Sequence, residues 1–171
     1  MRYVSTRGQS PAVGFVDAVL AGLAPDGGLY VPQAWPQFTH DQIAAFAGRP
    51  YHEVAAAVIG AFAGDEIEPA VLLEMCQEAY ATFTHKAVVP LVQIGPEAWL
   101  AELFHGPSLA FKDVAMQLLA RLYDHVLGIL QLQERRRVAA TQRPPFVRSN
   151  EECNLACPFQ YANCLACRKP R

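Results

Sequence analysis

The lysine at position 112 offers the clearest chemistry in this sequence. Lys112 follows the apolar residues Leu109, Ala110 and Phe111 and precedes Asp113, where a helical pattern begins. The positive end of a helix dipole and an apolar neighbourhood both favour the neutral form of a lysine amine. A neutral amine is the form that attacks an aldehyde to give a Schiff base. The residues alone leave two interpretations open: Lys112 is a Schiff-base lysine, or it is an ordinary solvated lysine in the first turn of a helix.

The cysteines are the second group that could do chemistry. Four of the five lie near the C-terminus, at Cys153, Cys157, Cys164 and Cys167. Four thiolates can bind zinc tetrahedrally, and the final Cys-x2-Cys pair has suitable spacing. The six residues between the two pairs are fewer than in the usual zinc arrangements, so we expect no metal site. The fifth, Cys76, falls on an apolar helical face and is predicted to be a core residue.

The charges divide the chain into two parts. Residues 1–127 hold six Lys/Arg against 13 acids, whereas residues 128–171 hold eight against three. The overall charge of -2 does not indicate nucleic-acid binding, and the Arg135–Arg137 run is interpreted as a helix end. The most apolar stretch, residues 54–64, is well below the roughly 18 residues of a membrane span. With no apolar segment at the N-terminus, we expect a cytoplasmic protein that does not contact a membrane.

Hydrophobic periodicity predicts the elements that must position Lys112. The predicted helices and strands alternate in an order that is typical of an α/β domain. Thr39 and Gln42 are spaced as a capping box, and Pro69 suits the first turn of a helix. The predicted helices cover 15–24, 41–47, 51–63 and 69–83 and continue from 113, and the predicted strands cover 2–5, 29–32, 88–94 and 99–104.

Three stretches resemble one family. FHGPSLAFKD at residues 104–113 closely resembles the pyridoxal-phosphate lysine motif of threonine synthases, F-H-G-P-T-x-x-F-K-D, with Ser108 in place of threonine. YVSTRG at residues 3–8 and GLAPDGGLYVP at residues 22–32 are similar to N-terminal segments of the same family, in the same order. Together the matches cover about residues 1–127.

The resemblance implies a pyridoxal-phosphate-dependent lyase on a fold-type II α/β scaffold. Threonine synthases convert the small molecule O-phospho-L-homoserine and water to L-threonine and phosphate, the last step of threonine biosynthesis. Lys112 matches the catalytic and cofactor-binding lysine, which holds pyridoxal 5'-phosphate and moves protons once substrate displaces it. The resemblance gives His105, Ser108, Phe111 and Asp113 a role in packing or orientation near the cofactor.

The family pattern is not matched after Asp113. In the family a later glycine-rich loop holds the cofactor phosphate, but the one glycine after Asp113 in this sequence is Gly128. We therefore expect a threonine-synthase-like N-terminal domain with an incomplete sheet at residues 1–127, and a basic, Cys- and Pro-containing tail at residues 128–171. The break in composition favours truncated or out-of-frame coding, which translation of the other two frames beyond codon 127 would test.

Several expectations follow for the chain by itself. We expect it to bind the cofactor weakly and to be inactive, because the phosphate anchor is missing. An incomplete sheet is expected to leave apolar residues such as Leu118, Leu119 and Leu122 without partners. Two alternatives remain open: a non-catalytic remnant or interaction module that pairs with a full-length subunit, and a tail that binds a metal through its four cysteines. The residues do not predict an oligomeric state.

Overall fold

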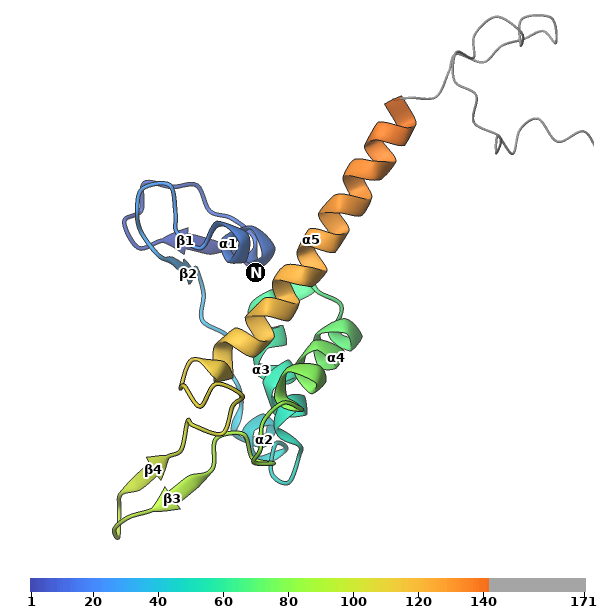
Figure 1. The fold of residues 1–171 in the computed structure, drawn as a ribbon. Helices are drawn as coiled ribbons and strands as arrows, with labels where there is room; N and C mark the ends of the chain where they lie inside the picture. The colour runs from blue at the N-terminus through green and yellow to red at the C-terminus, as the bar shows by residue number, and fades with distance from the viewer. Residues whose placement is uncertain (142–171) are drawn as a thin grey trace, which may run out of the picture. The chain divides into compact units, whose positions relative to one another are not determined.

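The computed structural model describes residues 1–141 of the chain. Contacts divide the chain into two units, Met1–Leu130 and Gln131–Arg171, and the arrangement described below is that of the first. The four cysteines of the candidate metal-binding tail lie outside the described residues. No helix within residues 1–141 is long and apolar enough to cross a membrane. The elements in chain order are β1 (Tyr3–Ser5), α1 (Phe15–Ala21), β2 (Tyr30–Pro32), α2 (His40–Ala44), α3 (Tyr51–Ala63), a 3-10 turn (Gly64–Glu66), α4 (Pro69–Tyr80), β3 (Leu91–Gln93), β4 (Trp99–Ala101) and α5 (Asp113–Thr141) (Figure 1).

The ends of the short helices follow local capping rules. The Thr39 side chain accepts the Gln42 backbone N–H and the Gln42 side chain accepts that of Thr39, which confirms the predicted capping box of α2. The predicted end of the first helix at residue 24 was wrong. α1 ends at Ala21 because Gly22 takes a φ of 68°, and Leu23 is consequently 59% exposed.

The hydrophobic core lies where α3, α4 and α5 meet. Cys76 is fully buried there, as predicted, and burial raises the pKa of its thiol to about 11. The prediction that Leu118 and Leu122 would lack partners was wrong, because both pack into this core. Leu73, the residue after Leu72 in α4, is 38% exposed. The buried members of the cluster are Ala63, Ile67, Leu72, Met75, Cys76, Ala79, Leu118 and Leu122.

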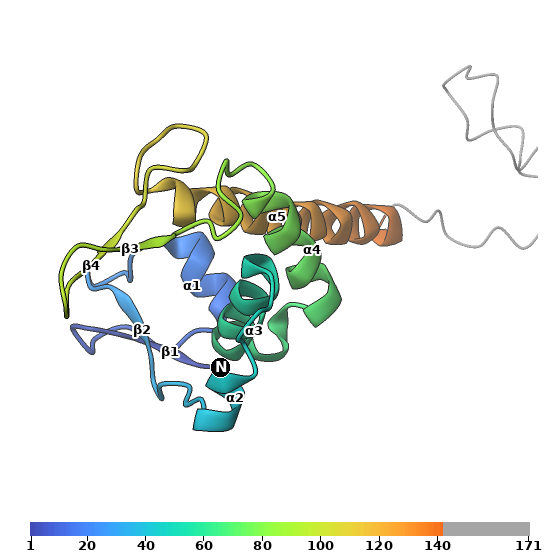
Figure 2. The same ribbon diagram turned by 90° about the horizontal axis from the view of Figure 1, so that it is seen from below.

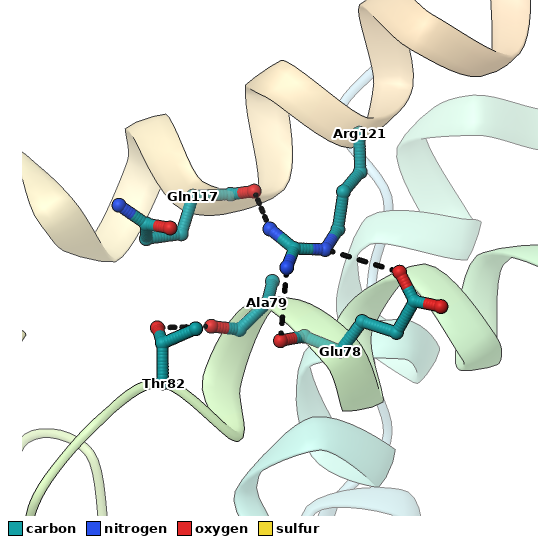
Figure 3. Close-up of polar contacts among 5 residues, drawn as sticks. All are labelled: Glu78, Ala79, Thr82, Gln117 and Arg121. Carbon is teal, nitrogen blue, oxygen red and sulfur yellow. Dashed lines mark hydrogen bonds and ion pairs between the residues drawn. The ribbon is translucent and has the colours of Figure 1, made fainter. Parts of the chain in front are cut away.

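Arg121 joins α5 to α4 at the edge of this core. Its guanidinium donates to the Glu78 carboxylate at 3.3 Å, to the Glu78 carbonyl at 3.2 Å and to the Gln117 carbonyl at 2.8 Å (Figure 3). The Thr82 hydroxyl closes the end of α4 by donating to the Ala79 carbonyl at 2.8 Å (Figure 3). These contacts hold the first half of α5, and hence the loop that precedes it, against the helical core.

The strands form two separate antiparallel pairs within the described residues. β1 pairs with β2, with Val4 opposite Val31, and β3 pairs with β4, with Val92 opposite Leu100. The β3–β4 hairpin extends from the helices, and all of its strand residues are exposed (Figures 1 and 2). The described part of the chain is therefore a mixed α/β structure with small sheets. Unpartnered apolar side chains lie on this hairpin and also on α5, where Leu127, Ile129, Leu130 and Leu132 are exposed.

Asp26 organises the turn that joins α1 to β2. Its carboxylate accepts the Ser5 hydroxyl at 2.7 Å, the Gly28 N–H at 2.9 Å and the Gln9 N–H at 3.0 Å. These hydrogen bonds, with that of Ser5 the largest cause, lower the pKa of Asp26 to about 2. A Cβ on Gly28 would collide with the Ser5 hydroxyl, so this turn requires glycine for its close packing.

The lowered pKa predicts a loss of stability in acid. Because the folded state holds Asp26 ionised below its unfolded pKa of about 4, its contribution is present above that pH and is lost as the pH falls towards 2. Asp26→Asn should therefore flatten the fall in melting temperature between about pH 4 and pH 2. Thermal unfolding followed by circular dichroism measures this, with Asp124→Asn on the exposed side of α5 as the control. An unchanged pH profile in Asp26→Asn would contradict the assignment.

Candidate functional site

The loop between β4 and α5 is held at its start by backbone and side-chain contacts. The Glu102 N–H donates to the Pro90 carbonyl at 3.0 Å, and the Glu102 carboxylate lies 2.8 Å from His105 Nε2. The His105 carbonyl in turn accepts the Thr84 N–H at 2.9 Å and the Thr84 hydroxyl at 3.2 Å. His105 is therefore fixed both through its ring and through its backbone. The sequence identified His105 but not Glu102 or Thr84 as part of this arrangement.

Asp113 closes the second half of the loop. Its Oδ2 accepts the Ser108 N–H at 2.7 Å, and its Oδ1 accepts the Ser108 hydroxyl at 2.8 Å. The Asp113 side chain is buried, with 5% of the residue exposed. A Cβ on Gly106 would lie 2.5 Å from Asp113 Oδ2, so only glycine fits at that position. Leu109, between these residues, has a φ of 60°, a conformation that costs a non-glycine residue about 1–3 kcal/mol and must be held by its surroundings.

Lys112 is the residue immediately before α5. Its carbonyl accepts the N–H groups of Ala115 at 3.1 Å and Met116 at 2.8 Å, so its backbone joins the first turn while its side chain stays outside the helix. The apolar neighbours of Lys112 do not cover its side chain within the described residues. Lys112 is exposed, and so are Leu109 (69%) and Phe111 (65%). In the described residues, therefore, the site offers an accessible primary amine on a fixed backbone.

The residues present fit one half of a pyridoxal-type ligand. An accessible amine at Lys112 can take up an aldehyde, and the exposed Leu109 and Phe111 offer apolar contact beside it. No ion pair of Lys112 occurs among residues 1–141, which leaves the amine without a bound carboxylate. Among residues 1–141 no equivalent cradle for the phosphate half follows the lysine, because Gly128, the one glycine after Asp113, lies within α5.

The comparisons with known proteins agree on one family. The family described as threonine synthase N terminus matches residues 2–80. The threonine synthase of Pseudomonas aeruginosa is 55% identical over 128 residues, which are 75% of this chain and 27% of that protein. The threonine synthase of Methylobacillus glycogenes is 38% identical over 137 residues, which are 75% of this chain and 29% of that protein.

Solved structures give the same result. The crystal structure of threonine synthase from Brucella melitensis, which is described as bound to pyridoxal phosphate, aligns with a TM-score of 0.74 and 60% identity. The alignment covers 77% of this chain and 28% of the Brucella chain. Yeast threonine synthase aligns with a TM-score of 0.68 and 34% identity over 83% of this chain and 28% of its own. The chain spans less than a third of the relatives that it matches, and the N-terminal part of this chain, over which they match, corresponds to the N-terminal portion of a threonine synthase.

Proposed function

We propose that Lys112 is the lysine that binds pyridoxal 5'-phosphate in a threonine synthase. The reaction is the conversion of O-phospho-L-homoserine and water to L-threonine and phosphate. The observation that carries the proposal is the accessible Lys112 amine, held by the FHGPSLAFKD loop at the start of α5. The similarity to threonine synthases over three quarters of the chain supports it.

The chain's own residues have two tasks in this chemistry. The cofactor, when bound, supplies the electron sink for the substrate's carbon skeleton. Lys112 Nζ would hold the cofactor aldehyde, and after substrate displaces it the free amine would take up and return protons. Asp113 and Ser108 would keep the Lys112 backbone in place throughout, because their hydrogen bonds close the loop immediately before α5.

The exposed hairpin supports a fold-type II scaffold with an incomplete sheet. Val92 and Leu100 face one side of the β3–β4 pair, while Leu91 and Trp99 face the other, and all four are exposed by 42–62%. Strands that are apolar on both faces are typical of sheets covered by helices on both sides. We therefore include in the proposal that residues 1–127 form a threonine-synthase-like domain with an incomplete sheet, and that residues 128–171 form a separate tail. In a full-length threonine synthase, later parts of the chain would complete this sheet. A cytoplasmic location is part of the same proposal.

The chain by itself should retain little cofactor. A lysine adduct without a phosphate cradle lacks the contacts that hold the rest of the molecule, so the adduct should hydrolyse during separation. We expect the visible absorbance of bound cofactor to be well below one equivalent after gel filtration. Whatever remains should depend on Lys112 and be lost in Lys112→Ala. Stable, stoichiometric cofactor on the 171-residue chain would contradict this prediction.

A hybrid protein tests the proposed function. In the P. aeruginosa threonine synthase, the N-terminal segment that matches this chain is replaced by the corresponding residues of this chain, Lys112 included. If the proposal holds, the hybrid forms threonine and inorganic phosphate from O-phospho-L-homoserine at a rate comparable to that of the parent enzyme. A folded hybrid that binds no cofactor and forms no threonine would contradict the proposal.

A second candidate function is that of a non-catalytic interaction module. The exposed apolar hairpin favours it, since apolar patches of this kind are typical of surfaces that contact another protein chain. Co-purification of this chain with a full-length threonine synthase, lost when Trp99 and Leu100 are replaced by serine, would support this function. Lack of association with a purified full-length enzyme would count against it.

A further inference from the structure

We infer that Asp113 is a positioning residue for Lys112, acting through a clamp formed by Gly106, Ser108 and Asp113. The inference rests on the proposed function of Lys112 and deepens it, because it assigns to a buried carboxylate the task of fixing the path of the backbone that carries the amine. Asp113 touches neither cofactor nor substrate in this role. It acts on Lys112 through the loop.

The Asp113 carboxylate accepts hydrogen bonds from the preceding loop rather than from the first turn of α5. As the first residue of α5, Asp113 could accept the free N–H groups of its own first turn, as acidic residues commonly do at helix starts. Its two oxygens instead receive the N–H and the hydroxyl of Ser108, five residues earlier. An ionised carboxylate accepts at both oxygens, so it matches two donors from one residue.

The clamp restricts the conformation of the backbone between Gly106 and Asp113. Gly106 packs so closely on Asp113 that no Cβ fits between them. Within the loop, the Leu109 N–H donates to the Gly106 carbonyl at 3.1 Å and the Asp113 N–H donates to the Ala110 carbonyl at 3.0 Å. The positive φ of Leu109 is held by these contacts. The backbone of Lys112, which lies between Ala110 and Asp113, therefore has little conformational freedom.

Lys112 is held from both sides as a result. The clamp fixes the chain before it, and the bonds from Ala115 and Met116 to its carbonyl fix the chain after it. The long side chain remains exposed, so the direction of its Cα–Cβ bond is the main constraint on where the amine can reach. Restricting an attacking group to a productive region raises its effective concentration at the bound aldehyde.

Reductive trapping in the full 171-residue chain tests the inference. The chain has three lysines, Lys86, Lys112 and Lys169, so the label from pyridoxal phosphate and borohydride can be assigned by peptide mass spectrometry. Lys86 is exposed and outside the loop, and serves as the internal reference. Trapping records the reversible adduct before any separation step, so weak retention does not obscure it. The measured quantity is the ratio of label on Lys112 to label on Lys86.

Three variants separate positioning from folding. Asp113→Asn keeps the shape but places a donor against one of the Ser108 donors, and Ser108→Ala removes the hydroxyl and leaves the backbone bond. We expect both to lower the Lys112:Lys86 ratio about ten-fold, the size of effect typical of lost hydrogen bonds to a charged group. Ser108→Thr retains the hydroxyl and should keep the ratio within about two-fold of the parent chain.

The outcomes separate the two claims. If the parent chain shows no preference for Lys112 over Lys86, the positioning inference is overturned, whereas the proposed function is decided by the hybrid protein. If the parent chain prefers Lys112 and a folded Ser108→Ala chain shows the same preference, the positioning inference alone is overturned. Should Asp113→Asn unfold, as judged by far-ultraviolet circular dichroism, the exposed Ser108 position still provides the decisive comparison between alanine and threonine.

Discussion

Replacing Lys112 by alanine in the hybrid with the P. aeruginosa enzyme should lower the rate of threonine formation on the order of 10³-fold or more. The reason is that one amine both holds the cofactor aldehyde and moves the proton, so no second group takes over either task. The exposed position of Lys112 at the start of α5 means that the substitution removes few packing contacts. We therefore expect the melting temperature of the apo-hybrid to change little while the activity is lost. Release of inorganic phosphate from O-phospho-L-homoserine measures the rate.

The matched control is Lys86→Ala. Lys86 is also exposed but lies between α4 and β3, outside the FHGPSLAFKD loop, so this variant should keep the activity of the hybrid within about two-fold. Equal losses in the two variants would indicate that the effect comes from lost positive charge on the surface. Activity that persists in Lys112→Ala would remove Lys112 from the catalytic role.

Replacing Leu72 by alanine should lower the free energy of unfolding by about 2–5 kcal/mol. Leu72 is 1% exposed and lies in the core between α3 and α4, so the truncation leaves a cavity among well-packed neighbours. Domains of this size have about 5–15 kcal/mol of stability in total, so the variant should lose a large fraction of its stability. Urea unfolding followed by circular dichroism measures the difference.

The next residue in α4 provides the control for this prediction. Leu73 has the same side chain and helix but is 38% exposed, and Leu73→Ala should lower the free energy of unfolding by about 1 kcal/mol or less. Similar losses at the two positions would show that the helix propensity of leucine, rather than burial of Leu72, sets the cost. Such a result would also contradict the placement of the core on the side of α4 that faces α3.

The helices were predictable from sequence where local chemistry determines their ends. α3 spans the predicted residues 51–63, and α4 begins at the predicted Pro69, whose missing N–H costs nothing in a first turn. The capping box at Thr39 was also predictable, because its two hydrogen bonds join residues three apart. Each of these features depends on neighbours along the chain.

Features that depend on distant contacts were not predictable. The burial of Leu118 and Leu122 follows from the packing of α5 on α4, which periodicity alone does not specify. The strands are shorter than predicted partly because Val88, at the predicted start of one, has a φ of 59°. Thr84 reaches His105 from 21 residues away, and no spacing rule indicates that contact. The exposure of Lys112 similarly reflects the absence of any described segment packed over the loop.

The central claim is that Lys112 is the amine that holds the cofactor, and the location of reduced cofactor in the hybrid protein tests it most directly. The hybrid is incubated with pyridoxal phosphate, treated with borohydride, digested and analysed by mass spectrometry. We predict one equivalent of pyridoxyl mass on the peptide that contains Lys112 and none on the peptide that contains Lys86. Stoichiometric label on Lys86, or on a lysine from the P. aeruginosa portion, would contradict the account.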